Sequence, residues 1–301
     1  MESGGATAVG DINQLPDDCL SHVISLTSSR DACASSAVST AFRSAADSDD
    51  TWQRFLPPDY LYMLSRAVAP VEYASKKELF FRLCDHPVLI DGGKLSFGLD
   101  RWSGKKSFMV SARALWIVWG SDERYWSWMP VPDSRFSEAI GLIDVCWLEI
   151  RGKISTKTLS PQTSYTVYLI FKLADTARGL GTPPQETAIT VGEEAVSRKS
   201  VCLQPDDRGR RRLLRGQFRM WGGWGVGAGM GMANEVDKDA ALPQKWESEG
   251  ERDDGWMEIE MGGFYNSNGE DGDVEMSFME VKGGHWKRGL ILHGIEIRPK
   301  H

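Results

Sequence analysis

The spacing of apolar residues changes near residue 88, from the helical period of 3.6 to the strand period of two. Upstream of this point, apolar residues recur every three or four positions, as on one face of an amphipathic helix. Downstream, as in Trp147–Ile154, apolar and polar residues alternate, which is the pattern of a half-buried antiparallel strand. About eight such short runs follow one another with no helical pattern between them. The sequence therefore predicts an α+β multidomain chain, with an all-α part followed by an all-β sandwich or jelly roll.

A small helical module is expected first. Pro16 suits a first helical turn, and Asp17 and Asp18 lie at the positive end of that helix dipole. The residues expected to cap three further helices are Asp31, Ser39, and either Asp50 or Thr51. A module of under about 50 residues buries little apolar surface, so it needs a neighbour or a partner to cover its apolar faces.

The boundaries follow from these periods and from changes in composition. Residues 1–10 are small and polar, as in a disordered tail. The helical module occupies 11–58, linker helices occupy 59–87, and the β-sandwich occupies 88–301. Within the sandwich, residues 204–254 hold an arginine run and a glycine run, which predict a mobile insert rather than strands.

Charge and cysteine usage limit the functional classes. The net charge is −7, so nucleic acid is not an expected partner, and the arginine run is interpreted as a solvated loop or a targeting signal. The five cysteines are scattered and odd in number, which favours a reducing compartment, cytosol or nucleus, over a disulfide framework. No signal peptide or membrane span is expected, because no apolar stretch is long enough.

No pattern predicts a catalytic or metal centre, and no cofactor is expected. The five histidines are scattered, and zinc needs several converging ligands. Paired carboxylates could support a jelly-roll glycosidase that uses Glu270 or Asp273 with Glu258 or Glu260. The simpler interpretation is a solvated strand face for Glu258 and Glu260, followed by a hairpin turn.

Tryptophan is the stronger signal. The chain has 12 Trp, and five of them fall within a short stretch: Trp116, Trp119, Trp126, Trp128 and Trp147. Some must fill the sandwich core. Trp119 and Trp126, however, flank a turn, where large aromatic side chains are less needed for packing. Exposed indoles beside carboxylates suit saccharide binding, because an indole covers the apolar face of a pyranose while a carboxylate accepts hydrogen bonds from its hydroxyls.

The order and spacing of several segments resemble the plant F-box proteins that carry a Nictaba-like phloem lectin domain. The F-box resemblance is carried by Leu15–Leu20, Val38–Asp49 and Trp52–Pro57. The lectin resemblance is carried by Ala114–Trp128, Cys146–Ile154, Thr163–Leu173, Asp254–Ile259, Gly269–Met276 and Gly294–Pro299. Together these segments cover most of the chain outside 204–254.

This resemblance implies a substrate receptor of a Skp-cullin-F-box ubiquitin ligase, found in cytoplasm and nucleus. The F-box would bind a Skp-type adaptor, which would supply the missing cover for the apolar face. The residues implied in adaptor binding are Leu15, Pro16, Leu20, Val23 and Ile24.

The resemblance also implies binding of N-acetylglucosamine oligomers or N-glycan cores on a glycoprotein client. Two tryptophans of the family match Trp119 and Trp126, and an acidic position matches Asp273, where the family usually has Glu. Two alternatives remain besides the lectin: a sandwich that has lost sugar binding and recognises a protein client, and the glycosidase.

Overall fold

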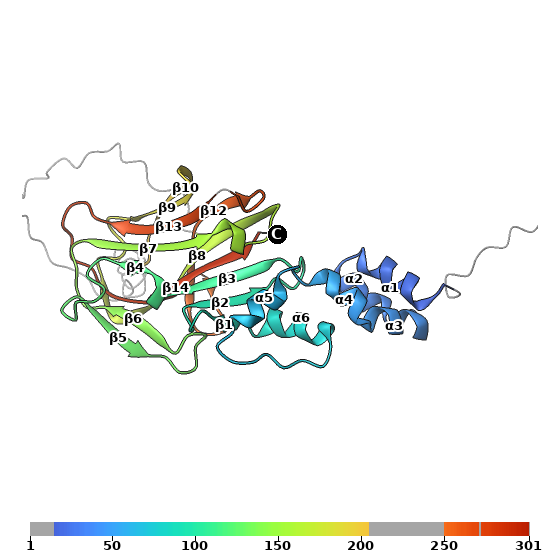
Figure 1. The fold of residues 1–301 in the computed structure, drawn as a ribbon. Helices are drawn as coiled ribbons and strands as arrows, with labels where there is room; N and C mark the ends of the chain where they lie inside the picture. The colour runs from blue at the N-terminus through green and yellow to red at the C-terminus, as the bar shows by residue number, and fades with distance from the viewer. Residues whose placement is uncertain (1–14, 205–249, 271, 301) are drawn as a thin grey trace, which may run out of the picture.

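The computed structural model describes residues 15–204 and 250–300, except residue 271. The expected tail at 1–10 and residues 205–249 of the expected insert at 204–254 lie outside the described residues. The end of the expected insert is described, and there the expectation is wrong, because Gly250–Glu251 form a short strand. Figure 1 shows the helices at one end of the molecule and the strands at the other, in the predicted order. Among the described residues, no helix combines the length and the apolar character needed to cross a membrane.

Four short helices form the N-terminal module: α1 (Asp17–Ser25), α2 (Ser29–Ser35), α3 (Thr40–Asp47) and α4 (Asp49–Phe55). Ser39 caps α3 by accepting the backbone N–H of Phe42, as expected. The other two expected caps are wrong by a few residues. Ser28 caps α2, with Asp31 in the first turn, and Ser48 caps α4. A serine hydroxyl at each of these positions reaches the N–H three residues on, which an acid inside the first turn does not.

Two linker helices, α5 (Tyr60–Ser65) and α6 (Lys76–Asp85), join the module to the strands. Trp52 of α4 is fully buried, and its ring centroid lies 5.3 Å from that of Phe80 and 5.2 Å from that of Phe81, both in α6. Its indole N–H donates to the Ala46 carbonyl at 2.7 Å. The apolar core of the module therefore continues into α6. Packing against α6 increases the apolar surface that this small module buries.

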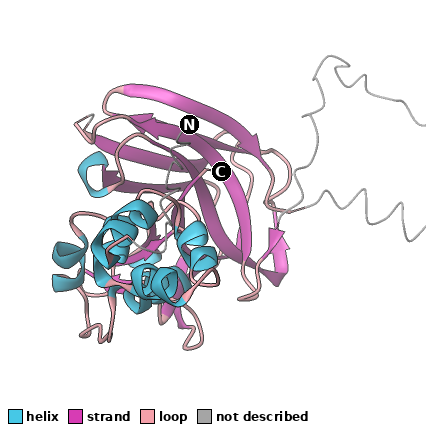
Figure 2. Cartoon of the chain, turned by 90° about the vertical axis from the view of Figure 1, so that its right-hand side faces the viewer, coloured by secondary structure: helices cyan, strands magenta, loops and turns pink. Residues whose placement is uncertain are grey.

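The strands form two curled antiparallel sheets (Figures 1 and 2). The nine-stranded sheet has the order β1-β2-β3-β14-β8-β12-β11, with β6 also paired to β14 and β5 paired to β6. Its strands are β1 (Val88–Ile90), β2 (Leu95–Leu99), β3 (Lys106–Ser111), β5 (Trp126–Pro130), β6 (Glu138–Leu142), β8 (Thr163–Arg178), β11 (Gly250–Glu251), β12 (Met257–Asn266) and β14 (Arg288–Pro299). The five-stranded sheet has the order β10-β9-β13-β7-β4. Its strands are β4 (Trp116–Ile117), β7 (Leu148–Ser155), β9 (Gln185–Val191), β10 (Glu194–Val201) and β13 (Asp273–Glu280).

The alternation predicted for β7 is confirmed. Leu148, Ile150 and Ile154 are buried in the common core, whereas Arg151 and Lys153 are exposed on the opposite face of the strand. Side chains alternate across a strand, so one face of the five-stranded sheet fills the sandwich and the other is left for solvent.

The helical module contacts the sandwich at the turn between β2 and β3. Ser29 of α2 donates a hydrogen bond of 3.0 Å to the Arg101 carbonyl. Gly104 has a φ of +66°, and a Cβ there would lie 2.7 Å from the Phe55 carbonyl oxygen, so only glycine allows this close approach. Figure 2, viewed from the helical end, shows the sheets behind the helices.

Candidate functional site

The outer face of the five-stranded sheet carries exposed tryptophan side chains and a row of charges. On β7 and just before it, this face presents Trp147, Glu149, Arg151 and Lys153. Antiparallel pairing places Glu275 of β13 opposite Lys153, and the side chains of such pairs lie on the same face. The result is a polar surface with large aromatic rings at one end.

Trp116 of β4 lies opposite Arg151 in the strand register, and its side chain is 55% exposed. The Arg151 guanidinium carbon lies 5.9 Å from the Trp116 ring centroid. Both residues line a hollow of about 330 Å³ that also includes Lys153, Thr190 and Glu275. An exposed ring beside hydrogen-bonding side chains is an arrangement that can hold the apolar face of a sugar and its hydroxyls together.

Trp147 is held in place by Glu149. The indole N–H of Trp147 donates to Oε2 of Glu149 at 2.9 Å, and Arg151 binds Oε1 of the same carboxylate at 2.6 Å. Burial opposes ionisation of Glu149, but the hydrogen bonds from Trp147 and Arg151 outweigh burial and lower the pKa of the carboxyl. One carboxylate therefore fixes both an exposed indole and the guanidinium beside Trp116.

Trp119 lies just beyond β4, in the connection to β5, and is 43% exposed. Its φ is +55°, a left-handed conformation that a bulky residue rarely adopts. Its ring centroid lies 5.2 Å from that of Tyr125, which comes from the other end of the same connection. The expected exposure of Trp119 is therefore observed, and its sugar contact stays a prediction.

Trp126 is placed differently from the expectation of an exposed ring. It is 1% exposed, begins β5, and donates its indole N–H to the Val118 carbonyl at 3.1 Å. A ring covered on both faces cannot stack on a sugar. The exposed indoles near Trp119 are instead Trp116 and Trp147, which the sequence marked only as members of the cluster. Each of them is next in sequence to a buried leucine, Leu115 and Leu148, and this alternation is the signal that could have identified them.

Asp273 starts β13 opposite Ser155, and its carboxylate pairs with Lys153 at 3.0 Å. Arg151, which lies opposite Trp116, precedes Ser155 by four residues along β7, a span of about 13 Å at 3.3 Å per residue. Asp273 and the tryptophans therefore lie on one face but do not surround one point. Only a ligand extended along β7 could touch both.

The carboxylates considered for a glycosidase are not brought together. Glu258 and Glu260 share a face of β12, as expected, but β12 belongs to the nine-stranded sheet and Asp273 to the other. Arg252 and Arg298 bind Glu258 at 2.9 and 2.8 Å, and Lys199 binds Glu260 at 2.6 Å. Glu270 lies before β13 and is exposed. These positions do not form the facing pair that glycoside hydrolysis requires.

The apolar residues expected to bind an adaptor divide into two groups. Leu15, Pro16 and Val23 are exposed, and Val23 is 52% exposed. Leu20 and Ile24 are 1% and 3% exposed, because they pack in the core of the helical module. The expectation that an adaptor covers all five side chains is thus wrong for Leu20 and Ile24, which are already buried in the core of the helical module.

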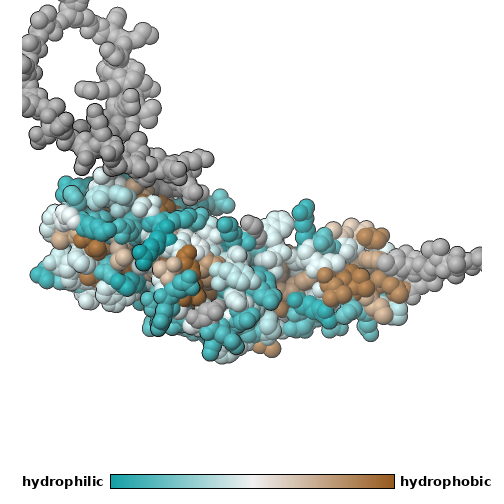
Figure 3. All heavy atoms as spheres, turned by 90° about the horizontal axis from the view of Figure 1, so that it is seen from above, coloured by the Kyte–Doolittle hydropathy of each residue, from teal (hydrophilic) through white to brown (hydrophobic). Residues whose placement is uncertain are grey.

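Two further apolar side chains extend this surface. Leu26, at the end of α1, is 65% exposed, and Val38, between α2 and α3, is 66% exposed. Leu26 follows Val23 by three residues, so the helical period was a signal that could have identified it, whereas Val38 belongs to no periodic apolar pattern. Figure 3 shows apolar surface gathered over the helical end of the molecule. Contiguous apolar surface of this kind marks a protein interaction site.

These features define a class of protein, in which a small helical interaction module is joined to an antiparallel β-sandwich with an aromatic, charged outer face. The chain belongs to the phloem protein 2 family, whose sequence model matches residues 105–299, and an F-box-like domain matches residues 12–57. The resemblance to plant F-box phloem-lectin proteins is confirmed.

Relatives in Arabidopsis thaliana align over nearly the whole chain. F-box protein At2g02240 is 44% identical over 95% of this chain and 79% of its own length. F-box protein PP2-B15 is 42% identical over 95% of this chain and 96% of its own length. A solved structure of TmCBM61 in complex with β-1,4-galactotriose aligns with 62% of this chain and 87% of its own, at 8% identity and a TM-score of 0.27.

Proposed function

We propose that this protein is the substrate-recognition subunit of a Skp-cullin-F-box ubiquitin ligase. Its helical module binds a Skp-type adaptor, and its β-sandwich binds an N-acetylglucosamine-type glycan on a client glycoprotein. The observation that carries the proposal is that one chain has two separate surfaces on which apolar or aromatic side chains are exposed to solvent. One is the exposed apolar surface of the F-box-like helices, and the other is the outer sheet face with Trp116 and Trp147, next to the connection that carries the exposed Trp119.

The adaptor surface consists of Leu15, Pro16, Val23, Leu26 and Val38. Burying exposed aliphatic side chains against a partner is favourable by roughly 25 cal/mol per Å² of apolar surface. A charge at the centre of such an interface costs affinity because it loses its water without gaining a partner.

Co-purification with a Skp-type adaptor tests this half of the proposal. The double variant Val23→Asp/Leu26→Asp should lose the adaptor while keeping its circular dichroism spectrum, because both side chains are exposed. Leu61→Asp is the matched control, since Leu61 is 61% exposed but lies on α5, outside the F-box-like match. An adaptor complex that survives the double variant, or that is lost equally in the control, contradicts the assignment.

The sugar-binding half is proposed to use Trp116, Trp119 and Trp147 as a stacking platform, with Asp273 contacting a more distant part of the same oligosaccharide. Trp126 then acts indirectly, by holding the connection that carries Trp119. A glycan array on the full chain should show binding to chito-oligosaccharides or N-glycan cores. Each of the substitutions Trp116→Ala, Trp119→Ala and Trp147→Ala should weaken that binding at least about tenfold.

Trp102→Ala is the control, because Trp102 is similarly exposed but lies in the turn between β2 and β3, outside the platform. If the native protein binds no glycan yet retains a client protein, the sandwich recognises protein surfaces, which is the second candidate function. Release of reducing sugar from chito-oligosaccharides would support the glycosidase instead. The proposed ligase role also requires the cytoplasm and nucleus, and five scattered cysteines, odd in number, suit a reducing compartment.

A further inference from the structure

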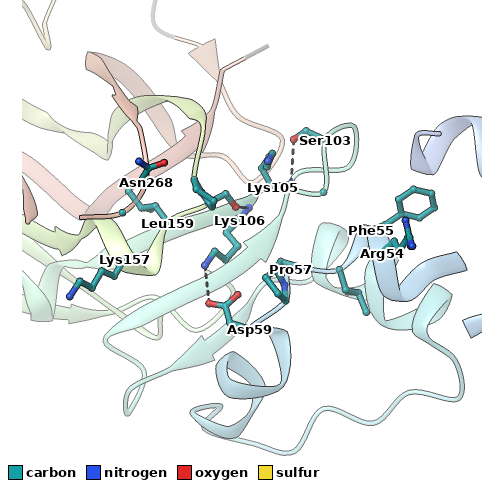
Figure 4. Close-up of a pocket in the computed structure, with 16 residues that line it drawn as sticks. Arg54, Phe55, Pro57, Asp59, Ser103, Lys105, Lys106, Lys157, Leu159 and Asn268 are labelled. Atoms are coloured by element: carbon teal, nitrogen blue, oxygen red, sulfur yellow. Dashed lines mark hydrogen bonds and ion pairs between the residues drawn. The ribbon is translucent and has the colours of Figure 1, made fainter. Parts of the chain in front are cut away.

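A cleft of about 450 Å³ lies where the helical module meets the sandwich. Four segments far apart in the sequence line it. They are the end of α4 and the residues that follow it, the turn between β2 and β3, the connection from β7 to β8, and the turn after β12. Figure 4 shows these segments around the cleft. None of its lining residues belongs to the tryptophan platform or to the exposed apolar surface of the F-box-like helices.

The cleft is positively charged in a chain whose net charge is −7. Its lining holds four basic side chains, Arg54, Lys105, Lys106 and Lys157, and one acid, Asp59. Lys106 is 4% exposed, and its ammonium pairs with Asp59 at 2.9 Å. Arg54, Lys105 and Lys157 have no ion-pair partner among the residues that the structure describes, so three positive charges stand in excess.

These charges are spread along the cleft. In Figure 4, Lys157 and Arg54 lie at opposite ends, with Lys106 and Asp59 between them. Apolar walls separate the charges, formed by Leu56, Pro57, Leu159 and Pro161 among others. A compact anion would meet one or two of these cations. A ligand that is extended, negatively charged and partly apolar would meet all of them.

One atom of the lining favours a peptide over other polyanions. Oδ1 of Asp59 is buried and has no hydrogen-bond partner among the described residues, whereas Oδ2 of the same carboxylate binds Lys106. A buried acceptor needs a donor. Phosphate and sulfate groups that carry full charge offer acceptors only, but a peptide offers backbone N–H groups together with acidic side chains.

We propose that this cleft binds an extended acidic peptide segment of a partner protein. Acidic side chains of the peptide pair with Lys157, Lys105 and Arg54, and one of its backbone N–H groups donates to Asp59. Apolar atoms of the peptide lie against the proline and leucine walls. This site would let the protein recognise a partner by sequence as well as by glycan, and it does not depend on the sugar platform.

The test is fluorescence anisotropy with the full chain and a labelled Glu-Ala repeat peptide of about ten residues, long enough to span such a cleft. The peptide should bind, and binding should weaken as the salt concentration rises from about 50 mM to about 300 mM. The double variant Lys105→Glu/Lys157→Glu should weaken binding by about tenfold, because it converts two attractions into repulsions.

Lys94→Glu is the matched control, because Lys94 is exposed in the turn at the opposite end of β2 and does not line the cleft. It should change the affinity less than about twofold. Absence of peptide binding overturns the proposal, as does equal weakening by Lys94→Glu. Inorganic polyphosphate that competes as well as the unlabelled peptide would assign the cleft to phosphate chains instead, and also overturns it. Unchanged circular dichroism and glycan binding in the double variant show that the fold and the sugar platform are intact.

Discussion

The indole N–H of Trp126 donates a hydrogen bond of 3.1 Å to the carbonyl oxygen of Val118, across the connection that carries Trp119. Val118 itself donates its backbone N–H to the Glu149 carbonyl in β7. The connection is therefore bound to both sheets. The indole of Trp126 binds it to the nine-stranded sheet, and the backbone hydrogen bond to Glu149 binds it to the five-stranded sheet. An exposed Trp119 in a left-handed conformation is kept in place by these two contacts.

Trp126→Phe should lower the free energy of unfolding by about 1–3 kcal/mol, because it removes the indole hydrogen bond and leaves a small cavity. Trp119→Ala should change it by less than about 0.5 kcal/mol, since that ring is substantially exposed. Urea denaturation measures both. Equal destabilisation by the two substitutions would show that Trp119 packs as a structural residue.

Trp52→Ala should destabilise the helical end by about 3–5 kcal/mol, as expected for deleting a buried aromatic ring. Trp52 contacts Phe80 and Phe81, so the loss should be transmitted to α6. Hydrogen exchange of the backbone amides measures the effect in α4 and in α6, and both helices should exchange faster. Trp102→Ala, at a 57% exposed ring, serves as the reference. Faster exchange confined to α4 would argue against the shared core.

Lys287 and Glu280 form an ion pair in which both side chains are almost fully buried. Lys287 also donates to the carbonyl oxygens of Cys146 and His285, which fixes the chain before β14. Lys287→Met should cost about 3–5 kcal/mol, because Glu280 is left buried without its cation. Adding Glu280→Leu should recover part of that loss in thermal or urea unfolding. A double variant no more stable than Lys287→Met would mean that an unpaired Glu280 is not the cause of the lost stability.

His293 predicts a pH dependence of stability. Burial, followed by the nearby Arg135, lowers its pKa from 6.5 to about 4, and Arg252, Lys172 and Asp254 also face it. The unfolded chain then binds a proton more readily than the folded chain between pH 6.5 and pH 4. The free energy of unfolding is therefore unaffected by the protonation of His293 above pH 6.5 and decreases as the pH is lowered from 6.5 to 4.

At pH 5 the free energy of unfolding should be lower by about 2 kcal/mol than at neutral pH, as a result of the protonation of His293. His293→Phe should remove this part of the pH dependence, because a phenyl ring can keep the stacking on Trp256, whose centroid lies 4.2 Å from that of His293. Urea denaturation at pH 5 and at pH 7.5 compares the two proteins. An unchanged pH dependence in His293→Phe would assign the effect to other groups.

The candidate sites show where inference from sequence stops. The cluster of tryptophans was recognisable, and so was the exposure of Trp119, because an aromatic residue at a turn has little to pack against. Which of the other rings is exposed depends on strand register. Trp126 begins a strand of the nine-stranded sheet and is buried, whereas Trp116 lies opposite Arg151 on an outer face. Leu20 and Ile24 differ from Val23 for a similar reason, since three helices cover one side of α1 and leave the other open.

The sequence by itself determined the order of the two modules, the antiparallel sandwich and the family, because period and motif are local properties of the chain. Only the tertiary structure decided which side chains share a surface. The basic cleft is the clearest case, since Arg54, Lys105 and Lys157 come from three separate segments. Their convergence depends on how the helical module packs against the sandwich, through contacts such as Ser29 to Arg101 and Gly104 to Phe55. Such long-range packing leaves no periodic signal in the chain.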